Sequence, residues 1–461
     1  MADPLGKPSE DRDEDEYELD PGLVTAVLDA VETADRATAV RLIEPLHVAD
    51  LADLTEQISA SKRRAFLSLV WDDIDKDVLA ELGENIRDEL VADLDPTMLA
   101  EAVKDLETDD AVYVLEGLED EAKDAVVDAL EPEDRVIIEK SLTYPEYSAG
   151  RLMQSEFVKA PPFWTVGQMI DQMRADDDLP EQFYDVYIVD AAMKPLGSIP
   201  LSKILGNPRP VSLDSLMIEK DRTLHVEDEQ EDVAYAFNQY HLVSCPVVDD
   251  DGRLVGVITI DDAMEVLEEE AEEDMRRLAG VGDEEITDRV WAITKRRFPW
   301  LAVNLVTAIL ASAVIALFDT VIAQFVALAV LMPIVASMGG NAATQTLTVA
   351  VRAIATRDLT PTNMLRIVGR EGLVGLINGI IFAVIIGVAA GLLYQSPVLG
   401  GVIAVAMVVN MLVAGLAGIL IPIGLERVGA DPALASGTFV TTVTDVVGFF
   451  AFLGLAALVL I

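Results

Sequence analysis

A single carboxylate lies deep in an apolar C-terminal region of the 461-residue chain. Asp445 follows a run rich in hydroxyl groups, and Thr438, Thr441 and Asp445 are spaced at i, i+3 and i+7. This spacing places all three on one stripe of a helix. A charged side chain inside a membrane costs about 3 kcal/mol and commonly marks a functional site. The stripe is therefore a candidate path for a cation.

A second polar group interrupts an apolar stretch further upstream. Residues 337–346 include Gly340, Asn341 and Gln345 and are too polar to face lipid, so they need protein or water beside them. For Asp445 itself, the structural alternative to a cation path is a hydrogen bond from Asn341 or Asn410 within a packed bundle.

Six acids occupy seven positions between residues 268 and 274. Their like-charged i, i+4 pairs each destabilise an isolated helix by a few tenths of a kcal/mol, and a divalent cation would offset that cost. The alternative is a salt-adapted surface, since arginines outnumber lysines by 22 to 11. Molar salt shortens the screening length to about 3 Å and removes much of the repulsion without a bound metal.

Five apolar stretches are long enough to cross about 30 Å of hydrocarbon, which takes roughly 20 residues. They are residues 300–318, 321–354, 372–393, 398–425 and 433–461. Basic residues flank these spans on one side only: Lys295, Arg296, Arg297, Arg352, Arg357, Arg366, Arg370 and Arg427. Positive residues favour the cytoplasmic side, so we expect a cytoplasmic N-terminus and a C-terminus outside the cell.

Charge divides the chain into two unlike parts. Residues 296–461 carry six acids and seven arginines, so residues 1–295 hold 74 of the 80 acids and 26 of the 33 basic residues, a net charge of −48. Nucleic-acid binding is excluded for this part, because a phosphate backbone requires a basic surface. Cys245 has no second cysteine to pair with. Residues 1–21 lack the apolar core of a signal peptide and are expected to form a disordered acidic tail.

Two modules are expected between this tail and the membrane region. Leucines recur every twelve residues at 82, 94, 106, 118 and 130, which predicts short stacked helices in an α-solenoid. Further on, a helix followed by two strands occurs twice. The expected ranges are 165–174, 186–189 and 198–201, then 229–240, 244–248 and 254–260. This duplication resembles a tandem pair of cystathionine-β-synthase (CBS) domains, which regulate membrane transporters and in some cases bind adenine nucleotides.

The whole arrangement resembles the MgtE family of magnesium transporters and channels. The most specific motifs are at residues 148–153, 339–345, 431–433 and 444–448. The resemblance implies a multidomain fold: a cytoplasmic α-solenoid, tandem α+β CBS domains, then an all-α domain of five transmembrane helices. The expected boundaries are 1–21 for the tail, 22–146 for the helical domain, 147–208 and 209–264 for the CBS domains, 265–294 for an acidic connecting helix, and 295–461 for the membrane domain.

The resemblance also implies a function and its residues. It implies a homodimer in the cell membrane with a Mg2+ pore on its two-fold axis, Mg2+ being both substrate and regulator. The implied pore residues are Asp445, Thr441, Thr438, Asn341, Gly340 and Gln345. The implied sensor ligands are Asp262, Glu270, Glu273 and Asp274, with Asp445 as the metal ligand of the pore. His241 stands where the family often has an acid, so that ligand differs here.

Other functions fit the sequence less well. An intramembrane aspartyl protease needs two carboxylates that share a proton, and Asp319 follows the first span on the wrong side of the membrane to meet Asp445. A membrane-anchored nucleotide sensor regulated by its CBS pair, or a transporter of another divalent cation, is the alternative.

Overall fold

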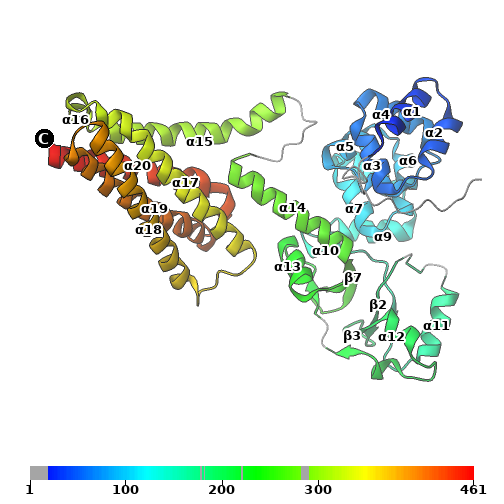
Figure 1. The fold of residues 1–461 in the computed structure, drawn as a ribbon. Helices are drawn as coiled ribbons and strands as arrows, with labels where there is room; N and C mark the ends of the chain where they lie inside the picture. Colours follow the sequence, from blue (N-terminus) through cyan, green and yellow to red (C-terminus); the bar gives the residue numbers. More distant parts are fainter. Residues whose placement is uncertain (1–18, 177–178, 181, 220–221, 282–289, 461) are drawn as a thin grey trace, which may run out of the picture. The chain divides into compact units, whose positions relative to one another are not determined.

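The computed structural model divides the chain into two compact units, residues 1–267 and 268–461 (Figure 1). It describes residues 19–176, 179–180, 182–219, 222–281 and 290–460, without the side chains of residue 292 and residues 434–436. The expected tail, residues 1–21, lies almost wholly outside the described residues. We describe each unit by itself.

Nine short helices and one 3-10 turn form the N-terminal part of the first unit. They are α1 Pro21–Glu32, α2 Arg36–Ile43, α3 Val48–Gln57, α4 Ala60–Val70, η2 Lys76–Leu79, α5 Glu84–Asp93, α6 Pro96–Asp105, α7 Thr108–Glu116, α8 Asp120–Ala129 and α9 Pro132–Ser141. Helices α5 to α9 begin twelve residues apart, as the leucine period predicts. Leu82, Leu106, Leu118 and Leu130 are buried in one continuous apolar core, so this period records the packing of successive helices.

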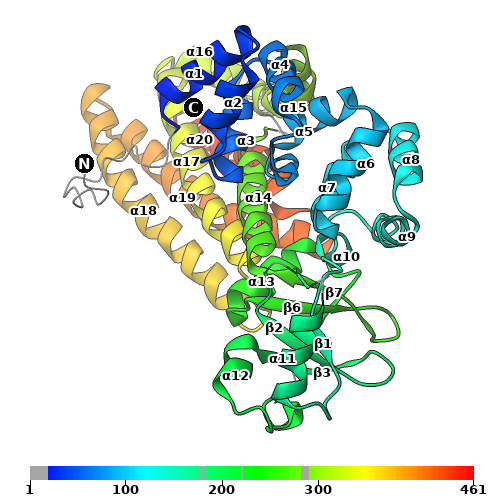
Figure 2. The ribbon, with the colours of Figure 1, turned by 90° about the vertical axis from the view of Figure 1, so that its right-hand side faces the viewer.

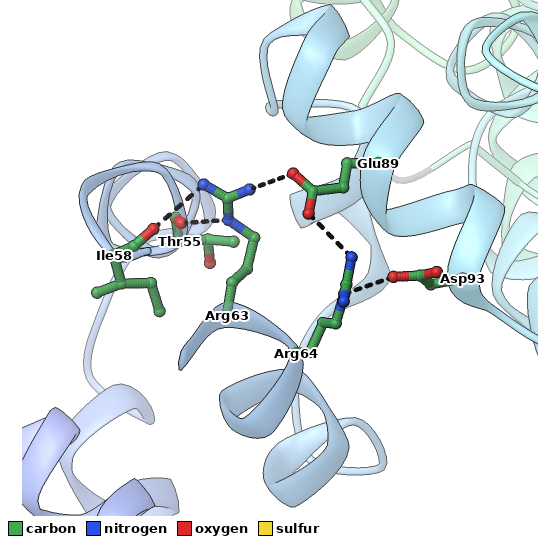
Figure 3. Close-up of polar contacts among 6 residues, drawn as sticks. All are labelled: Thr55, Ile58, Arg63, Arg64, Glu89 and Asp93. Carbon is green, nitrogen blue, oxygen red and sulfur yellow. Dashed lines mark hydrogen bonds and ion pairs between the residues drawn. The ribbon is translucent and has the colours of Figure 1, made fainter. Parts of the chain in front are cut away.

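A buried arginine joins three of these helices (Figure 3). Arg63 on α4 donates from Nε to the carbonyl oxygen of Thr55 at 2.9 Å and from Nη2 to that of Ile58 at 3.2 Å. These carbonyls end α3, where a positive charge also stabilises the helix dipole. Glu89 on α5 accepts from Arg63 and from Arg64, and Arg64 also pairs with Asp93.

Two small sheets of related topology complete the first unit (Figure 2). The first has the order β1 Lys159–Ala160, β2 Asp185–Val189, β3 Pro195–Pro200 and β4 Ile218–Glu219; the second has β5 Leu224–His225, β6 Ser244–Val248 and β7 Leu254–Thr259. In both, a short parallel strand precedes an antiparallel pair, with a register shift at the second strand. The duplication expected from the sequence is confirmed.

Short helices accompany these sheets. They are α10 Ala149–Leu152, α11 Val166–Ala175, α12 Leu201–Gly206, η3 Leu213–Ser215 and α13 Gln230–Tyr240. His241 ends α13 with φ 52° and is exposed. The expected helices and strands agree with the structure to within a few residues at each end.

The acidic helix is shorter than expected. Helix α14 spans Ile260–Ala279, so the prediction of one helix over residues 265–294 is wrong. Gly280 adopts φ 69°, its N–H bonds to the Arg277 carbonyl, and the Val281 N–H bonds to the Arg276 carbonyl. These two bonds form a Schellman motif, which ends a helix at a left-handed glycine. Residues 282–289 lie outside the described residues.

Six helices form the second unit beyond α14, and five of them contain a stretch long and apolar enough to cross a membrane. They are α15 Val290–Ala316, α16 Asp319–Gln324, α17 Ala327–Ala355, α18 Met364–Leu393, α19 Pro397–Arg427 and α20 Pro432–Leu460. The short helix α16 does not span. Helix α19 packs against α17, α18 and α20 and is the most buried. The predicted fold class, with five membrane helices after the helical and CBS domains, is confirmed.

Three predicted spans begin elsewhere in the structure. The first was expected from residue 300, but α15 already includes residues 290–299. The second was expected to begin at Val321, but Phe325 leaves the helical region (φ −128°, ψ 78°) and separates α16 from α17. Helix α17 then continues unbroken through residues 337–346, because polar side chains leave the backbone bonds intact. The third span begins at Met364 rather than Gly372, since its charged first turns extend beyond the apolar stretch.

Candidate functional site: an ion path and its acidic control regions

Three hydroxyl groups of α20 bond within their own helix. Thr441 donates to the carbonyl oxygen of Gly437 at 2.9 Å, Thr442 to that of Thr438 at 2.6 Å, and Thr444 to that of Thr441 at 2.9 Å. A hydroxyl that gives its hydrogen to its own backbone keeps lone pairs that only accept. Oxygen acceptors of this kind suit a cation and its water shell.

Asp445 lies one turn beyond Thr441 on the same stripe and is half-buried. Helix α18 also contains an acid, Glu371, which is mostly buried beside Arg370. It lies in the second turn of a 30-residue helix, which at 1.5 Å per residue exceeds the hydrocarbon thickness. Among the described spans, Asp445 is thus the acid placed furthest from a helix end.

A polar stripe runs along α17 and is exposed in the single chain. Its members are Ser337, Asn341, Thr344, Gln345 and Thr348. Gly340 borders this stripe and lies beside α20. A Cβ atom at Gly340 would lie 4.0 Å from Cγ2 of Thr441. The structure therefore brings Gly340 together with Thr441. It leaves Asn341 and Gln345 on an outward surface of the unit.

Asn410 on α19 has a structural role instead of binding Asp445. Its amide donates to the carbonyl oxygen of Val335 at 2.7 Å, and the side chain is fully buried. Gly339 and Gly448 make room for it, since a Cβ on either would stand within 3.0 Å of the amide. The structure thus gives the Asn410 amide a partner on the α17 backbone, and among the described hydrogen bonds none joins Asn410 to Asp445.

An acidic cluster surrounds Asp262 in the first unit. Burial raises the pKa of Asp262 to about 6, and the neighbouring Asp261 charge adds to the effect against hydrogen bonds from Thr259. Burial and nearby carboxylates raise the pKa of Glu107 to about 7 and that of Asp110 to about 8. The pKa of Asp109 is raised well above its usual value for the same reasons. Burial and neighbouring negative charges thus disfavour the charged form of each of these carboxylates.

A second acidic region lies in the second unit. Burial, with the charges of Asp431 and Glu270, raises the pKa of Asp274 to about 6. Asp431 caps α20 by accepting from the Ala433 N–H at 2.7 Å and also pairs with Arg277. Arg277 pairs in turn with Glu273. Of the predicted sensor residues, Glu270, Glu273 and Asp274 thus lie together around Asp431, whereas Asp262 belongs to the cluster of the first unit.

Three residues of the first cluster were missed by the sequence interpretation: Glu107, Asp109 and Asp110. They begin α7, about 150 positions before Asp262, in a turn that resembles those opening α8 and α9. No local signal distinguishes them. Within the described residues, no three carboxylate, imidazole or thiolate groups are close enough to chelate one ion directly.

A narrow cleft lies between the two sheets. Its lining includes Phe157, Phe183, Asp185, Tyr187 and Ser244, and the Ser244 hydroxyl donates to Asp185 at 2.8 Å. The open volume is about 10 Å³, which is room for about one water molecule. A nucleotide would enter only if the cleft widened.

The fold and these groups define a multi-pass membrane protein with oxygen-rich spans and a CBS-containing acidic domain. Family models match it in three places: "MgtE: Divalent cation transporter" at residues 332–455, "MgtE intracellular N domain" at 46–147, and "CBS domain" at 213–269. A magnesium transporter MgtE of Enterococcus faecalis is 33% identical over 321 residues, 70% of this chain and 71% of that protein. One of Thermus thermophilus is 33% identical over 335 residues, covering 71% and 73%. The chain belongs to the MgtE family of divalent cation transporters.

A solved structure is also similar. It is the cytosolic domain of the Mg2+ channel MgtE in complex with ATP, 27% identical, covering 53% of this chain and 99% of that one with a TM-score of 0.49.

Proposed function

We propose that this chain transports Mg2+ across the cell membrane through a pore formed by two copies, and that cytoplasmic Mg2+ closes the pore. The observation that carries the proposal is the pair of polar surfaces on α17 and α20, which meet at Gly340 and Thr441. Asp445 provides the negative charge on one of them. The magnesium transporters that the chain resembles support the choice of ion.

The exposed stripe on α17 supports the homodimer. Asn341, Thr344 and Gln345 are exposed in a helix otherwise apolar enough to span a membrane. Amide and hydroxyl groups facing hydrocarbon are costly, so such residues face a protein or a water-filled cavity. A second copy related by a two-fold axis places the same stripe opposite itself. It thereby supplies both a protein neighbour and a water-filled cavity for these residues.

Hydrated Mg2+ suits this lining. The ion keeps several of its waters and commonly takes one or two carboxylates instead of a complete protein cage. One Asp445 from each copy, with threonine oxygens that only accept hydrogen bonds, would hold the water shell. Basic residues at the helix ends from Lys295 to Arg427 favour a cytoplasmic N-terminus and a C-terminus outside.

The acidic clusters support control by Mg2+. Glu107, Asp110 and Asp262 have raised pKa values because burial and mutual repulsion disfavour their charged forms. A divalent cation reverses both effects, and through its waters it can join carboxylates that are too far apart to chelate it directly. The Asp274 and Asp431 region offers the same chemistry beside the start of α20.

The experiment is Mg2+ flux into liposomes containing the purified full chain. Asp445→Asn should abolish flux while the chain still assembles as the wild type does. Asp319→Asn removes the same charge from an exposed position at the start of α16 and is the matched control. Wild-type flux in Asp445→Asn would remove the proposed pore.

A further inference from the structure

The segment of residues 148–156 holds helix α7 at its C-terminal end through Arg151. The Arg151 guanidinium forms an ion pair with Glu116, the last residue of α7. Its Nε donates to the carbonyl oxygen of Tyr144 and its Nη2 to that of Leu142, both at 2.9 Å. The side chain of Arg151 is 12% exposed and that of Glu116 is 32% exposed, so the pair is partly buried.

The same segment holds the N-terminal end of α7. Glu156 accepts from the Thr108 hydroxyl at 2.7 Å and from its N–H at 3.3 Å, which caps the helix from outside. Gln154 donates to the Glu107 carboxylate at 3.0 Å. Both ends of this helix therefore contact the same nine consecutive residues, but only the C-terminal end does so through a cation.

These residues belong to the CBS part of the unit by their backbone bonds. The Ala149 N–H donates to the carbonyl oxygen of Asp228 at 2.8 Å, and that of Gly150 to Val226 at 2.9 Å. Gln154 and Val257 exchange two backbone hydrogen bonds, at 2.9 and 3.0 Å. The segment is thus fastened to the second sheet and connects that sheet to α7.

The two ends of α7 differ in charge. At the C-terminal end a cation of the protein, Arg151, pairs with Glu116 and offsets part of the burial that raises the pKa of this carboxyl. At the N-terminal end Glu107, Asp109 and Asp110 face the charge of Asp262 with no comparable compensation. Without metal, the C-terminal end of α7 is therefore attracted to Arg151, whereas its acidic N-terminal end is repelled by Asp262.

We propose that the Arg151–Glu116 pair is a metal-independent hinge that keeps α7 on the CBS domains, so that Mg2+ controls only the approach of its acidic end to Asp262. The proposal rests on the regulation proposed above and identifies the point about which α7 turns. Arg151 and Glu116 are positioning residues: they bind no Mg2+ but keep Glu107 and Asp110 near Asp262. Because the acidic end is tethered, less Mg2+ is needed to close it than two free domains would need.

The test measures the Mg2+ concentration at half-maximal protection of the full chain from protease, at constant high KCl, and in parallel the internal Mg2+ that halves liposome flux. Glu116→Gln keeps the shape of the side chain and removes its charge. We expect both midpoints to rise at least about fivefold, the lower bound for coupled sites. Glu121→Gln, an exposed acid on α8, makes the same charge change and should leave both midpoints unchanged.

Arg151→Gln and the double variant with Glu116→Gln complete a mutant cycle. If the two residues act as a pair, the double variant raises the midpoint no further than Arg151→Gln alone, which also removes the hydrogen bonds to Tyr144 and Leu142. Normal flux at low internal Mg2+ and the wild-type level of protection at saturating Mg2+ show that the variants are folded.

Different outcomes overturn different claims. An unchanged midpoint in Glu116→Gln, or additive effects in the double variant, would overturn the hinge. If Mg2+ still closed the wild-type protein, the proposed regulation would stand. Absence of any Mg2+ response in the wild type would overturn both.

Discussion

The hydroxyl of Thr438 donates to the amide oxygen of Asn304 at 2.8 Å and so joins α20 to α15. Helix α15 buries little of its surface within the unit. This hydrogen bond is therefore important for the position of α15. The bond also commits the Thr438 hydrogen, so the Thr438 oxygen can only accept. Asn304 was not identified from the sequence, and it adds an amide to the stripe that leads to Asp445.

Thr438→Val should lower Mg2+ flux about tenfold. The substitution keeps the shape, removes one oxygen from the stripe and deprives Asn304 of its donor, a loss of about 1 to 1.5 kcal/mol. Liposome flux at low internal Mg2+ measures it. Thr438→Ser should retain flux, and Thr442→Val, which removes a hydroxyl bonded within its own helix, should change it less. Equal flux in the Thr438→Val and wild-type proteins would contradict the role of this contact.

Two adjacent glycines should respond oppositely to alanine. A Cβ on Gly339 would stand 2.2 Å from Nδ2 of the buried Asn410, whereas one on Gly340 meets nothing closer than 4.0 Å. Gly339→Ala should destabilise the membrane unit by about 1 to 3 kcal/mol through overpacking. Gly340→Ala should be neutral or stabilising by up to about 1 kcal/mol, since alanine favours helix.

Thermal unfolding of the full chain in detergent compares them. Gly339→Ala should unfold at a lower temperature than the wild type and Gly340→Ala should not. The reverse order would mean that Asn410 does not pack as described.

The sequence predicted the helical repeat and the duplicated sheets well because their signals are local. The twelve-residue leucine period reflects contacts between neighbouring helices, and helices α5 to α9 begin at the same spacing of twelve residues. The ends of spans were harder, since Arg366, Arg370 and Glu371 continue α18 outside the apolar stretch. The break at Phe325 has no glycine or proline to mark it.

The sequence suggests candidate site residues only where they lie on one segment. Helical spacing places Thr438, Thr441 and Asp445 on one stripe, whereas Glu270, Glu273 and Asp274 come from the resemblance to the MgtE family. Glu107, Asp109 and Asp110 become part of the site only because α7 is placed beside Asp262 by tertiary contacts. Arg151 and Glu156, which make those contacts, have no distinctive spacing of their own.

The closed form of the first unit, in which the acidic end of α7 lies beside Asp262, should become less stable as pH rises from 6 to 8 when Mg2+ is absent. The pKa values of Asp262, Glu107 and Asp110 are raised to about 6, 7 and 8, above those of exposed acids near 4. The closed form therefore binds more protons than the open form within this window, and its stability falls as pH rises through the raised values. Mg2+ favours the charged carboxylates, so it should reduce this dependence.

Protease cleavage of the full chain at pH 6, 7 and 8, with and without Mg2+, measures the effect. Glu107→Gln with Asp110→Asn should flatten the dependence, whereas Glu101→Gln, an exposed acid on α6, should not. Greater protection at pH 8 than at pH 6 without Mg2+ would show that the sign is wrong.

Replacing Glu270 and Glu273 by Gln and Asp274 by Asn should leave transport active at high internal Mg2+. In the proposed regulation these acids, near Asp431 at the start of α20, are the metal-responsive part of the second unit. Glu84, Glu101 and Glu121 replaced together by Gln give the same change in net charge at exposed positions of the first unit. Liposome flux against internal Mg2+ should separate the two variants. Unchanged shut-off in the first variant would assign its acids to a solvated, salt-adapted surface.

Mg2+ should also protect the full chain from protease in a saturable way at millimolar concentration, even in about 2 M KCl. The net charge of −48 over residues 1–295 means that any cation relieves general repulsion, so protection at low salt would not identify a site. In about 2 M KCl the screening length falls below about 3 Å and this general effect is already complete. Specific sites remain, because a divalent ion gains more Coulomb energy than K+ from clustered carboxylates. A titration at constant KCl that reaches a plateau supports the sensor; a flat response would leave only a salt-adapted acidic surface, and the proposed closure by Mg2+ would have to be withdrawn.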